Sequence, residues 1–318
     1  MEYVILIAAL AGIVFGADFL VAGAVSIARK YRVSDFVIGA AIVGVGTSMP
    51  ELVVSFIGAL TGNADVAIGN VVGSNIFNVL GILGLTAIFF PAAVSKSNMK
   101  FELPVCIAVS VLLIILVFNF FTGNTPMISR ADGLILLVCF GMFMWYSFYR
   151  DRKQNAEVAE EVPSEDEKTP LWLAVVKVVG GLAVLITSCD LFVDNAVVIA
   201  KEFGVNDAFI SLTLIACGTS LPELAASLAA ALKKNTQLAL GNVIGSNIFN
   251  ITWILGLSAQ VMPLNSSGIT AMDYFVMVVA ATVPMILGVK GKIGRFSGAF
   301  MFLGFVAYNW YLLNTQMI

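Results

Sequence analysis

Long apolar runs limit the folds open to this chain more than any other feature. A helix needs about 20 apolar residues to cross the hydrocarbon core of a bilayer. Ten such runs can be placed, at residues 3–26, 34–60, 66–90, 101–121, 131–149, 171–199, 206–232, 237–262, 271–289 and 295–313. They lack the alternation of apolar and polar residues that is typical of a membrane β-barrel. Because only 12% of the 318 residues are charged, we expect an all-α integral membrane protein with ten transmembrane helices.

The distribution of basic residues predicts which side of the membrane each loop faces. If the amino terminus is outside, the cytoplasmic loops hold 14 of the 17 basic residues. The outer loops hold only Arg130 and Lys201, and Lys177 lies within the sixth run. Cytoplasmic loops carry an excess of Lys and Arg, so we expect a plasma-membrane protein with both termini outside. The polar, acidic segment 150–170 is then a cytoplasmic linker, and its acids are interpreted as solvated rather than cation-binding.

Two parts of the chain repeat each other at one constant spacing. Residues 46–52 (GTSMPEL) match 218–224 (GTSLPEL) at six of seven positions, and 69–78 match 241–250 at nine of ten. The step from 46 to 218 equals the step from 69 to 241, and this common offset indicates a duplication. Since each copy holds five runs, the second copy enters the membrane from the opposite side, as in the inverted repeats of secondary transporters. We therefore predict a first repeat at 1–149 and a second, inverted repeat at 171–318. A duplicated bundle without a transport role leaves unexplained why the best-matched stretches are the most polar.

The first repeated motif places an acid in the middle of a membrane span. Glu51 and Glu223 lie near the centres of the second and seventh runs, where a charged side chain costs about 2.5–3.5 kcal/mol. Each follows a proline, which removes a backbone donor and breaks or kinks a helix. Backbone carbonyls freed near Thr47 and Thr219 then become available to a cation. If the repeats bring the two glutamates together, their repulsion requires a cation or protons. A protonated structural pair and an ordinary proline kink are the plainer interpretations.

The second motif adds hydroxyl and amide oxygens. Ser74 and Asn78 are four residues apart and share a helix face, as do Ser246 and Asn250. Such residues can simply pack helices together, and glycines alongside them allow a close approach. The functional interpretation is an all-oxygen site, which suits calcium with its six to eight oxygen ligands. The chain has no histidine, so we do not expect this site to bind copper or zinc.

At these motifs the chain resembles the calcium/cation antiporter superfamily, in its prokaryotic sodium/calcium exchanger branch. The resemblance covers nearly the whole chain and implies a central group of ion sites. By position, it implies that Glu51, Glu223 and the carbonyls of Thr47 and Thr219 bind calcium. It further implies an inner sodium site at Ser48, Ser74 and the Gly44 carbonyl, an outer sodium site at Ser220, Ser246 and the Ala216 carbonyl, and Asn78 and Asn250 beside the centre.

The same resemblance implies the mode of transport. It implies a secondary antiporter that exchanges three sodium ions for one calcium ion by alternating access. Several relatives, including potassium-dependent ones, have aspartate where this chain has Asn250, so we expect potassium-independent, electrogenic exchange. The expected partners are sodium, calcium and the lipid bilayer, without nucleic acid or cofactor, and the expected functional unit is a monomer. Asp18, Asp190 and Asp194 are interpreted as support residues.

Three other functions compete with sodium/calcium exchange. A proton/calcium antiporter is the alternative, because glutamates can carry protons. The proton-coupled branch usually has an acid within the second motif, where this chain has Gly73 and Gly245. An intramembrane hydrolase using Ser48 or Ser220 lacks a histidine to activate the serine, so we do not expect an enzyme. By analogy with known folds, a passive channel does not need inverted repeats with two broken helices.

Overall fold

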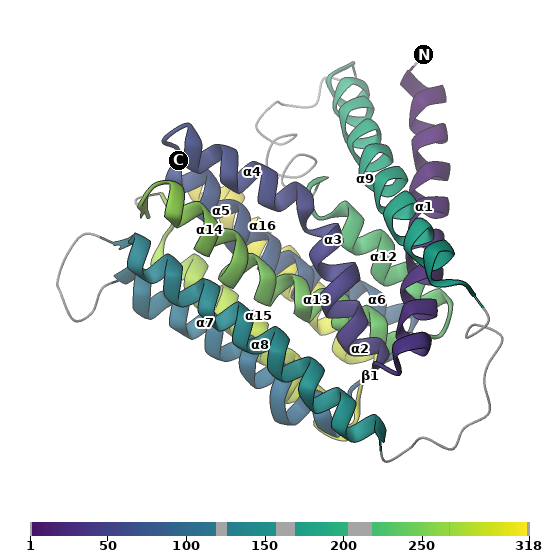
Figure 1. Cartoon of the computed structure of the whole chain (residues 1–318). Helices are drawn as coiled ribbons and strands as arrows, with labels where there is room; N and C mark the ends of the chain where they lie inside the picture. The colour runs from purple at the N-terminus through teal and green to yellow at the C-terminus, as the bar shows by residue number, and fades with distance from the viewer. Residues whose placement is uncertain (1, 119–125, 157–168, 203–217, 267, 317–318) are drawn as a thin grey trace.

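The computed structural model describes residues 2–118, 126–156, 169–202, 218–266 and 268–316, and helices make up almost all of it (Figure 1). The first half contains α1 (Glu2–Tyr31), α2 (Asp35–Ile38), η1 (Gly39–Gly44), α3 (Val45–Thr47), α4 (Met49–Leu60), α5 (Ala64–Ile76), η2 (Phe77–Leu83), α6 (Gly84–Phe89), β1 (Ala92–Ala93), η3 (Asn98–Glu102), α7 (Leu103–Phe118), β2 (Met127–Ile128) and α8 (Arg130–Ala156). The second half contains α9 (Leu171–Glu202), α12 (Leu221–Leu232), α13 (Thr236–Phe249), η6 (Asn250–Ile254), α14 (Leu255–Val261), β3 (Leu264–Asn265), α15 (Ala271–Leu287), η7 (Gly288–Lys290), β4 (Lys292–Ile293) and α16 (Arg295–Gln316).

Most of the expected membrane spans are present as helices. In the described part of the chain, eight helices are long and apolar enough to cross a membrane. A ninth span is the pair Asp35–Thr47 and Met49–Leu60, which bends by 49° at Ser48. Of the expected span 206–232, the structure describes the part from residue 218, which contains α12, and the remainder lies outside the described residues. The protein is thus an all-helical, multi-pass membrane protein, and the count of ten spans stays a prediction.

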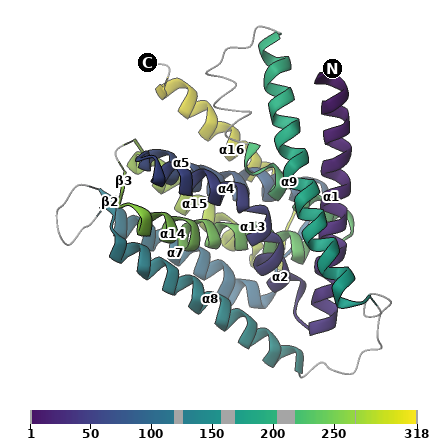
Figure 2. The same cartoon turned by 45° about the horizontal axis from the view of Figure 1, so that its top comes forward.

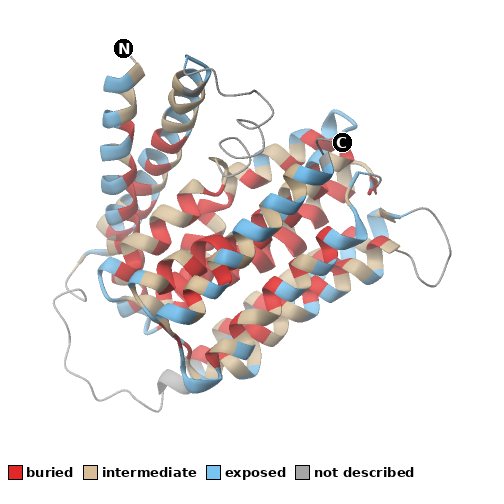
Figure 3. Cartoon of the chain, turned by 180° about the vertical axis from the view of Figure 1, so that it is seen from behind, coloured by how far each residue is buried: buried red, intermediate tan, exposed pale blue. Residues whose placement is uncertain are grey.

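Two spans form the centre of the molecule. In an 18-residue window of the span Thr236–Val261, 94% of the residues are buried, and the corresponding share for Ala64–Phe89 is 78%. For the other six single-helix spans it is at most 39%. Buried residues accordingly concentrate on the central helices (Figure 3). These two spans carry the second repeated motif, and each widens into a π-helical turn, η2 or η6, where that motif ends. The spans that carry the second repeated motif therefore face protein rather than lipid.

Helices α1 and α9 form a pair that stands beside this central group in both views (Figures 1 and 2). Glycines let the two backbones approach closely. A methyl group added at Gly16 would lie 2.6 Å from the backbone nitrogen of Leu185, and one added at Gly181 would lie 2.6 Å from that of Leu20. Small residues at a helix contact allow this kind of packing in membranes.

Short strands tie the two halves of the chain together at two places. Strand β1 pairs antiparallel with β4, and β2 pairs antiparallel with β3. Each two-stranded sheet therefore takes one strand from each half. Strands β1 and β3 begin at Ala92 and Leu264, which are equivalent positions of the two repeats, so the duplication extends to the loops after the central spans.

Candidate ion-binding site

Two helix breaks position the repeated glutamates. Helix α4 begins directly after Ser48 and α12 directly after Ser220, and the two serines have nearly the same backbone angles (φ −81°, ψ 11° and φ −93°, ψ 10°). A proline in the first turn of each helix lacks the backbone donor that would continue the preceding helix. Glu51 and Glu223 therefore lie in the first turn of α4 and α12, where the helix dipole favours a negative charge.

The two breaks face each other through reciprocal hydrogen bonds. The Ser48 hydroxyl donates to Glu223 Oε1 at 2.7 Å, and the Ser220 hydroxyl donates to Glu51 Oε1 at 2.7 Å. Each serine comes three residues before the glutamate of its own motif and bonds the glutamate of the other. Both carboxyl groups are completely buried. The structure thus brings together two glutamates that belong to different repeats and lie far apart in the sequence.

Amides on the central spans hold the broken helix ends. Asn70 donates to the Glu51 carbonyl at 3.1 Å and to the Ser55 hydroxyl at 3.0 Å. Asn242 makes the equivalent bonds, to the Glu223 carbonyl at 3.1 Å and to the Ser227 hydroxyl at 2.8 Å. Sequence reasoning overlooked the two serines, although they occupy equivalent positions of the two repeats and could have been found by that relation.

A second reciprocal arrangement joins α5 to α13. The Asn75 amide donates to the Asn247 carbonyl at 3.2 Å, and the Asn247 amide donates to the Asn75 carbonyl at 3.0 Å. The side-chain oxygens of these residues accept bonds from Asn250 and Asn78, both at 3.1 Å. Asn78 and Asn250 therefore donate hydrogen bonds from their side-chain nitrogens to Asn247 and Asn75, and their side-chain oxygens accept none in the described structure.

Four of the buried oxygens without a hydrogen-bond partner in the described structure belong to acids and amides of the two repeated motifs. They are Oε2 of Glu51 and of Glu223 and Oδ1 of Asn78 and of Asn250. Buried polar atoms are almost always satisfied, so each such atom needs an explanation. A carboxylate oxygen and an amide oxygen are both acceptors, and both are ligands that calcium and sodium take in proteins. The unpartnered set thus fits a hard cation.

The donor set has only two carboxylates. Among the described residues, no group of three or more His, Cys, Asp or Glu side chains is arranged to hold a metal ion. A cation bound here would have to complete its shell with hydroxyl, amide and carbonyl oxygens. Such a site has less negative charge than a three-carboxylate site and suits an ion that is bound and released.

The hydrogen bonds group the remaining candidate residues differently from expectation. The resemblance places Ser74 with Gly44, but the Ser74 hydroxyl accepts from Ser220 at 3.1 Å and lies 3.5 Å from Glu51 Oε1. It places Ser246 with Ser220, but Ser246 donates to the Gly44 carbonyl at 3.2 Å. The reason is that serines from one repeat meet the broken helix of the other repeat, a crossing that spacing along the chain does not reveal.

The two threonines differ in their surroundings. The Thr47 hydroxyl lies 3.2 Å from Asn242 Oδ1 and 3.4 Å from the Gly44 carbonyl. The Thr219 hydroxyl is buried without a partner. Ala216, expected to contribute a carbonyl, lies outside the described residues.

A cavity of about 300 Å³ reaches this site from one side. Its lining includes Asn70, Gly73 and Ser74 of α5, together with Asp273 of α15 and Tyr308 of α16. The equivalent face of α13 is filled, because a methyl group added at Gly245 would lie 2.3 Å from the Cα of Ala40 in η1. Among the described residues the cavity therefore lies along α5, while η1 covers the equivalent face of α13; residue 212, which corresponds to Ala40, lies outside the described residues.

The three intramembrane aspartates lie on the α1–α9 pair. Asp18 forms an ion pair with Lys233, with 2.6 Å between the Asp18 Oδ1 and Lys233 Nζ atoms. Asp190 and Asp194 are exposed on α9. None of the three contributes a hydrogen bond to the buried glutamates among the contacts described above.

Comparisons with known proteins agree with this arrangement. The chain matches the sodium/calcium exchanger protein family over residues 1–149 and 173–314. Inner membrane protein YrbG of Escherichia coli (strain K12) is 34% identical over 319 residues, which cover 96% of this chain and 94% of YrbG. Sodium/calcium exchanger MaX1 of Methanosarcina acetivorans is 30% identical over 344 residues, which cover 97% of each chain.

A structure of the sodium-calcium exchanger NCX_Mj superposes with a TM-score of 0.81, at 31% identity and with 96% of each chain covered. The family resemblance inferred from the two repeated motifs is thus confirmed. Members of this family are transporters and not enzymes. The chain belongs to the sodium/calcium exchanger family.

Proposed function

We propose that this protein exchanges sodium for calcium at one central site by alternating access. The observation that carries the proposal is the set of four buried, unpartnered oxygens on Glu51, Glu223, Asn78 and Asn250. Two carboxylates and two amide oxygens in the membrane interior need a cation to offset their desolvation. The match to the exchanger family supports calcium as one of the ions.

The remaining ligands of the proposed sites come from hydroxyls and carbonyls around the two helix breaks. Glu51 and Glu223, with the carbonyls of Thr47 and Thr219, would bind calcium. The residues proposed for sodium are Ser48, Ser74, Ser220, Ser246, Gly44 and Ala216. Hydrogen bonds between Ser74 and Ser220 and between Ser246 and Gly44 favour sodium sites built from both repeats at once.

The charges of the ions suggest how exchange is coupled. One calcium ion neutralises two ionised carboxylates, whereas three sodium ions leave one positive charge. Because the same glutamates would serve both sets of ions, sodium and calcium would compete. We infer three sodium ions per calcium and movement of one net charge in each cycle, without potassium.

We further infer ten helices, arranged as inverted repeats at 1–149 and 171–318 and joined by a cytoplasmic linker at 150–170. Reciprocal hydrogen bonds between matching residues of the two motifs support a two-fold relation between the repeats. The basic loops support a plasma-membrane orientation with both termini outside.

The test is calcium uptake by reconstituted vesicles loaded with sodium. Wild-type protein should take up calcium only when sodium leaves, and Glu51→Gln and Glu223→Gln should each abolish uptake. Removing one buried charge partner typically costs about 2–5 kcal/mol, or a loss of about 30-fold to several thousand-fold. Asp194→Asn is the matched control, because it also replaces an acid by an amide but on the exposed face of α9. Normal uptake by either glutamate variant at matched protein content would reject the proposed site.

The same vesicles separate sodium exchange from the proton-coupled alternative. Calcium uptake driven by a pH gradient in sodium-free medium would favour a proton/calcium antiporter, since buried glutamates can also carry protons. Uptake that follows the calcium gradient alone, without any counter-ion, would indicate a passive channel.

A further inference from the structure

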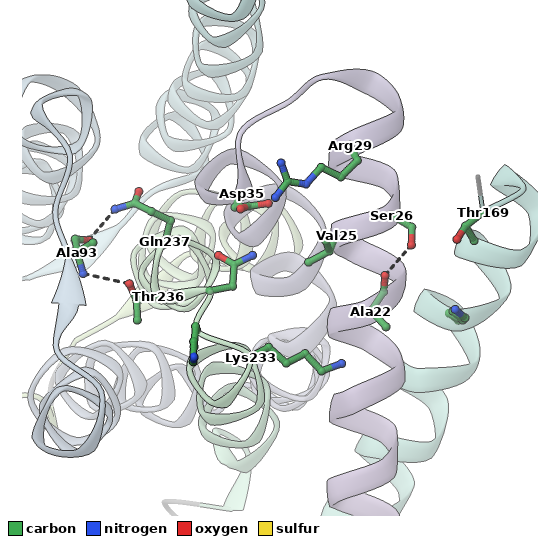
Figure 4. A pocket seen from close by; sticks show the side chains of 13 residues that line it. Ala22, Val25, Ser26, Arg29, Asp35, Ala93, Thr169, Lys233, Thr236 and Gln237 are labelled. Carbon is green, nitrogen blue, oxygen red and sulfur yellow. Dashed lines mark hydrogen bonds between the residues drawn. The ribbon is translucent and has the colours of Figure 1, made fainter. Parts of the chain in front are cut away.

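A second cavity, of about 600 Å³, lies between the α1–α9 pair and the turn that joins α12 to α13 (Figure 4). It shares no lining residue with the ion-binding site. It lies near the carboxyl end of α1 and the amino end of α9, where both helices reach the edge of their membrane spans. The cavity therefore lies at a membrane–water interface, beside the lipid headgroups.

Basic side chains predominate in the lining of this cavity. Arg29, Lys177, Lys233 and Lys234 line it, together with a single acid, Asp35. The ion pair with Asp18 partly neutralises Lys233. Asp35 lies beside Arg29 (Figure 4), so the remaining positive excess is carried by Lys177 of α9 and Lys234 of the turn between α12 and α13. Positive charges held close together at the boundary of a low-dielectric region favour the binding of an anion.

Lys177 stands out among them because it is half-buried within the α9 span. A basic residue inside a membrane span normally has an anionic partner or faces water. Gly23 of α1 packs against its stem, since a methyl group there would lie 2.9 Å from the Lys177 Cβ. The side chain is thus held at the wall of the cavity.

A helix amino terminus contributes a second, independent preference for anions. The first residues of α13, Thr236 and Gln237, line the cavity. Their side chains are fixed by Ala93, whose N–H donates to the Thr236 hydroxyl at 3.1 Å and whose carbonyl accepts from Gln237 at 2.6 Å. The Leu238 N–H of the first turn already donates to the Asn235 side chain at 3.1 Å. This 14-residue helix therefore contributes mainly the positive end of its dipole, which favours a phosphate group.

From these features we infer that the cavity binds the phosphate group of an anionic ligand. Lysine and arginine with a helix amino terminus are the usual phosphate-binding groups, and basic pockets between transmembrane helices at the cytoplasmic face bind anionic lipid headgroups. The two sources of such a group are a phospholipid such as phosphatidylglycerol and soluble inorganic phosphate. With the proposed orientation, the lipid would come from the inner leaflet.

Two binding measurements on the purified full-length protein distinguish these sources. The first compares retention of phosphatidylglycerol with retention of phosphatidylcholine by native mass spectrometry. The second measures thermal stabilisation in detergent by inorganic phosphate, against sodium chloride at equal ionic strength. Selective retention of phosphatidylglycerol assigns the cavity to a lipid headgroup, and stabilisation by phosphate alone assigns it to a soluble anion. Binding of neither probe overturns the inference.

Lysine variants test whether the measured binding takes place in this cavity. Lys177→Gln and Lys234→Gln should each weaken binding of the effective probe about fivefold, and the double variant more than tenfold. Lys234 is exposed, so its replacement does not endanger folding if the Lys177 variant proves unstable. The double variant Lys290→Gln/Lys292→Gln is the matched control, because both lysines are exposed and neither lines the cavity. An equal loss in the control, or no loss in Lys234→Gln, would contradict the assignment.

Discussion

Replacing one glycine of each repeat by alanine tests the asymmetric packing of the two central spans. Gly245 and Gly73 occupy equivalent positions of the second repeated motif. A methyl group added at Gly245 would lie 2.3 Å from the Cα of Ala40, whereas one added at Gly73 would meet none of the described residues within 4 Å. Ordinary contact begins at 3.4 Å, so α13 and η1 would have to separate by about 1 Å in Gly245→Ala alone.

Separating α13 from η1 would lower the free energy of unfolding. It would also strain the bond at 3.2 Å between Ser246 and the Gly44 carbonyl, which lies beside the contact. Overpacking of this kind typically costs about 1–3 kcal/mol, and the upper end applies because the obstructing atom belongs to the backbone. We therefore expect the apparent melting temperature of Gly245→Ala to fall by about 5 °C. Gly73→Ala should change it by less than about 1 °C.

The assay is thermal unfolding of the purified variants in detergent, followed by tryptophan fluorescence. Gly241→Ala and Gly69→Ala provide a second matched pair. A methyl group at Gly241 would lie 2.2 Å from the Phe36 carbonyl, while among the described residues one at Gly69 would meet the side chain of Ile269, at 3.1 Å. Equal destabilisation by both members of a pair would refute the asymmetric packing.

Charged and amide groups provide three further predictions. Asn250→Asp should keep exchange but change its pH or potassium dependence, because three like charges in one cavity rarely all ionise; identical profiles of uptake for variant and parent would exclude Asn250 from the site. Glu102 and Arg150 form a buried ion pair. Neutralising either partner alone should lower the free energy of unfolding by about 3–5 kcal/mol, whereas the double variant Glu102→Gln/Arg150→Met should recover much of that stability. If the losses of the two single variants simply add in the double variant, as measured by thermal unfolding, the pair does not contribute. Calcium uptake clamped with valinomycin and potassium should respond to the membrane potential, which acts on one charge with about 2.3 kcal/mol per 100 mV; indifference to the potential would favour electroneutral exchange.

Much of this fold follows from the sequence because the bilayer imposes strong constraints. Spans must be long and apolar, and a proline followed by an acid in mid-span has few structural solutions. The bend of 49° at Ser48, two residues before Pro50, is therefore predictable. The meeting of Glu51 and Glu223 follows from the repeat, since equivalent residues near a two-fold axis lie close together.

Other features depend on contacts that the sequence pattern does not contain. The family resemblance groups Ser74 with Ser48 and the Gly44 carbonyl, and the structure adds a contact of Ser74 with Ser220 of the other repeat. The hydroxyl of a serine in one repeat can contact the broken helix of its own repeat or that of the other repeat. Only the packing of the helices decides which contact forms. The mutual bonds of Asn75 and Asn247 were likewise hidden within a motif that small-residue packing could have explained.

The packing asymmetry is the feature that sequence comparison could never supply, because the two motifs are nearly identical. Gly73 and Gly245 have nearly the same neighbours in sequence, yet among the described residues one faces a cavity and the other a helix backbone. The alternating access proposed above would require a second structure in which the two repeats exchange roles. In that structure α13 would face an opening and α5 would be covered, so the buried glutamates would be approached from the other side. The near identity of the two motifs supports this proposal, because each copy could then make the contacts that the other makes here.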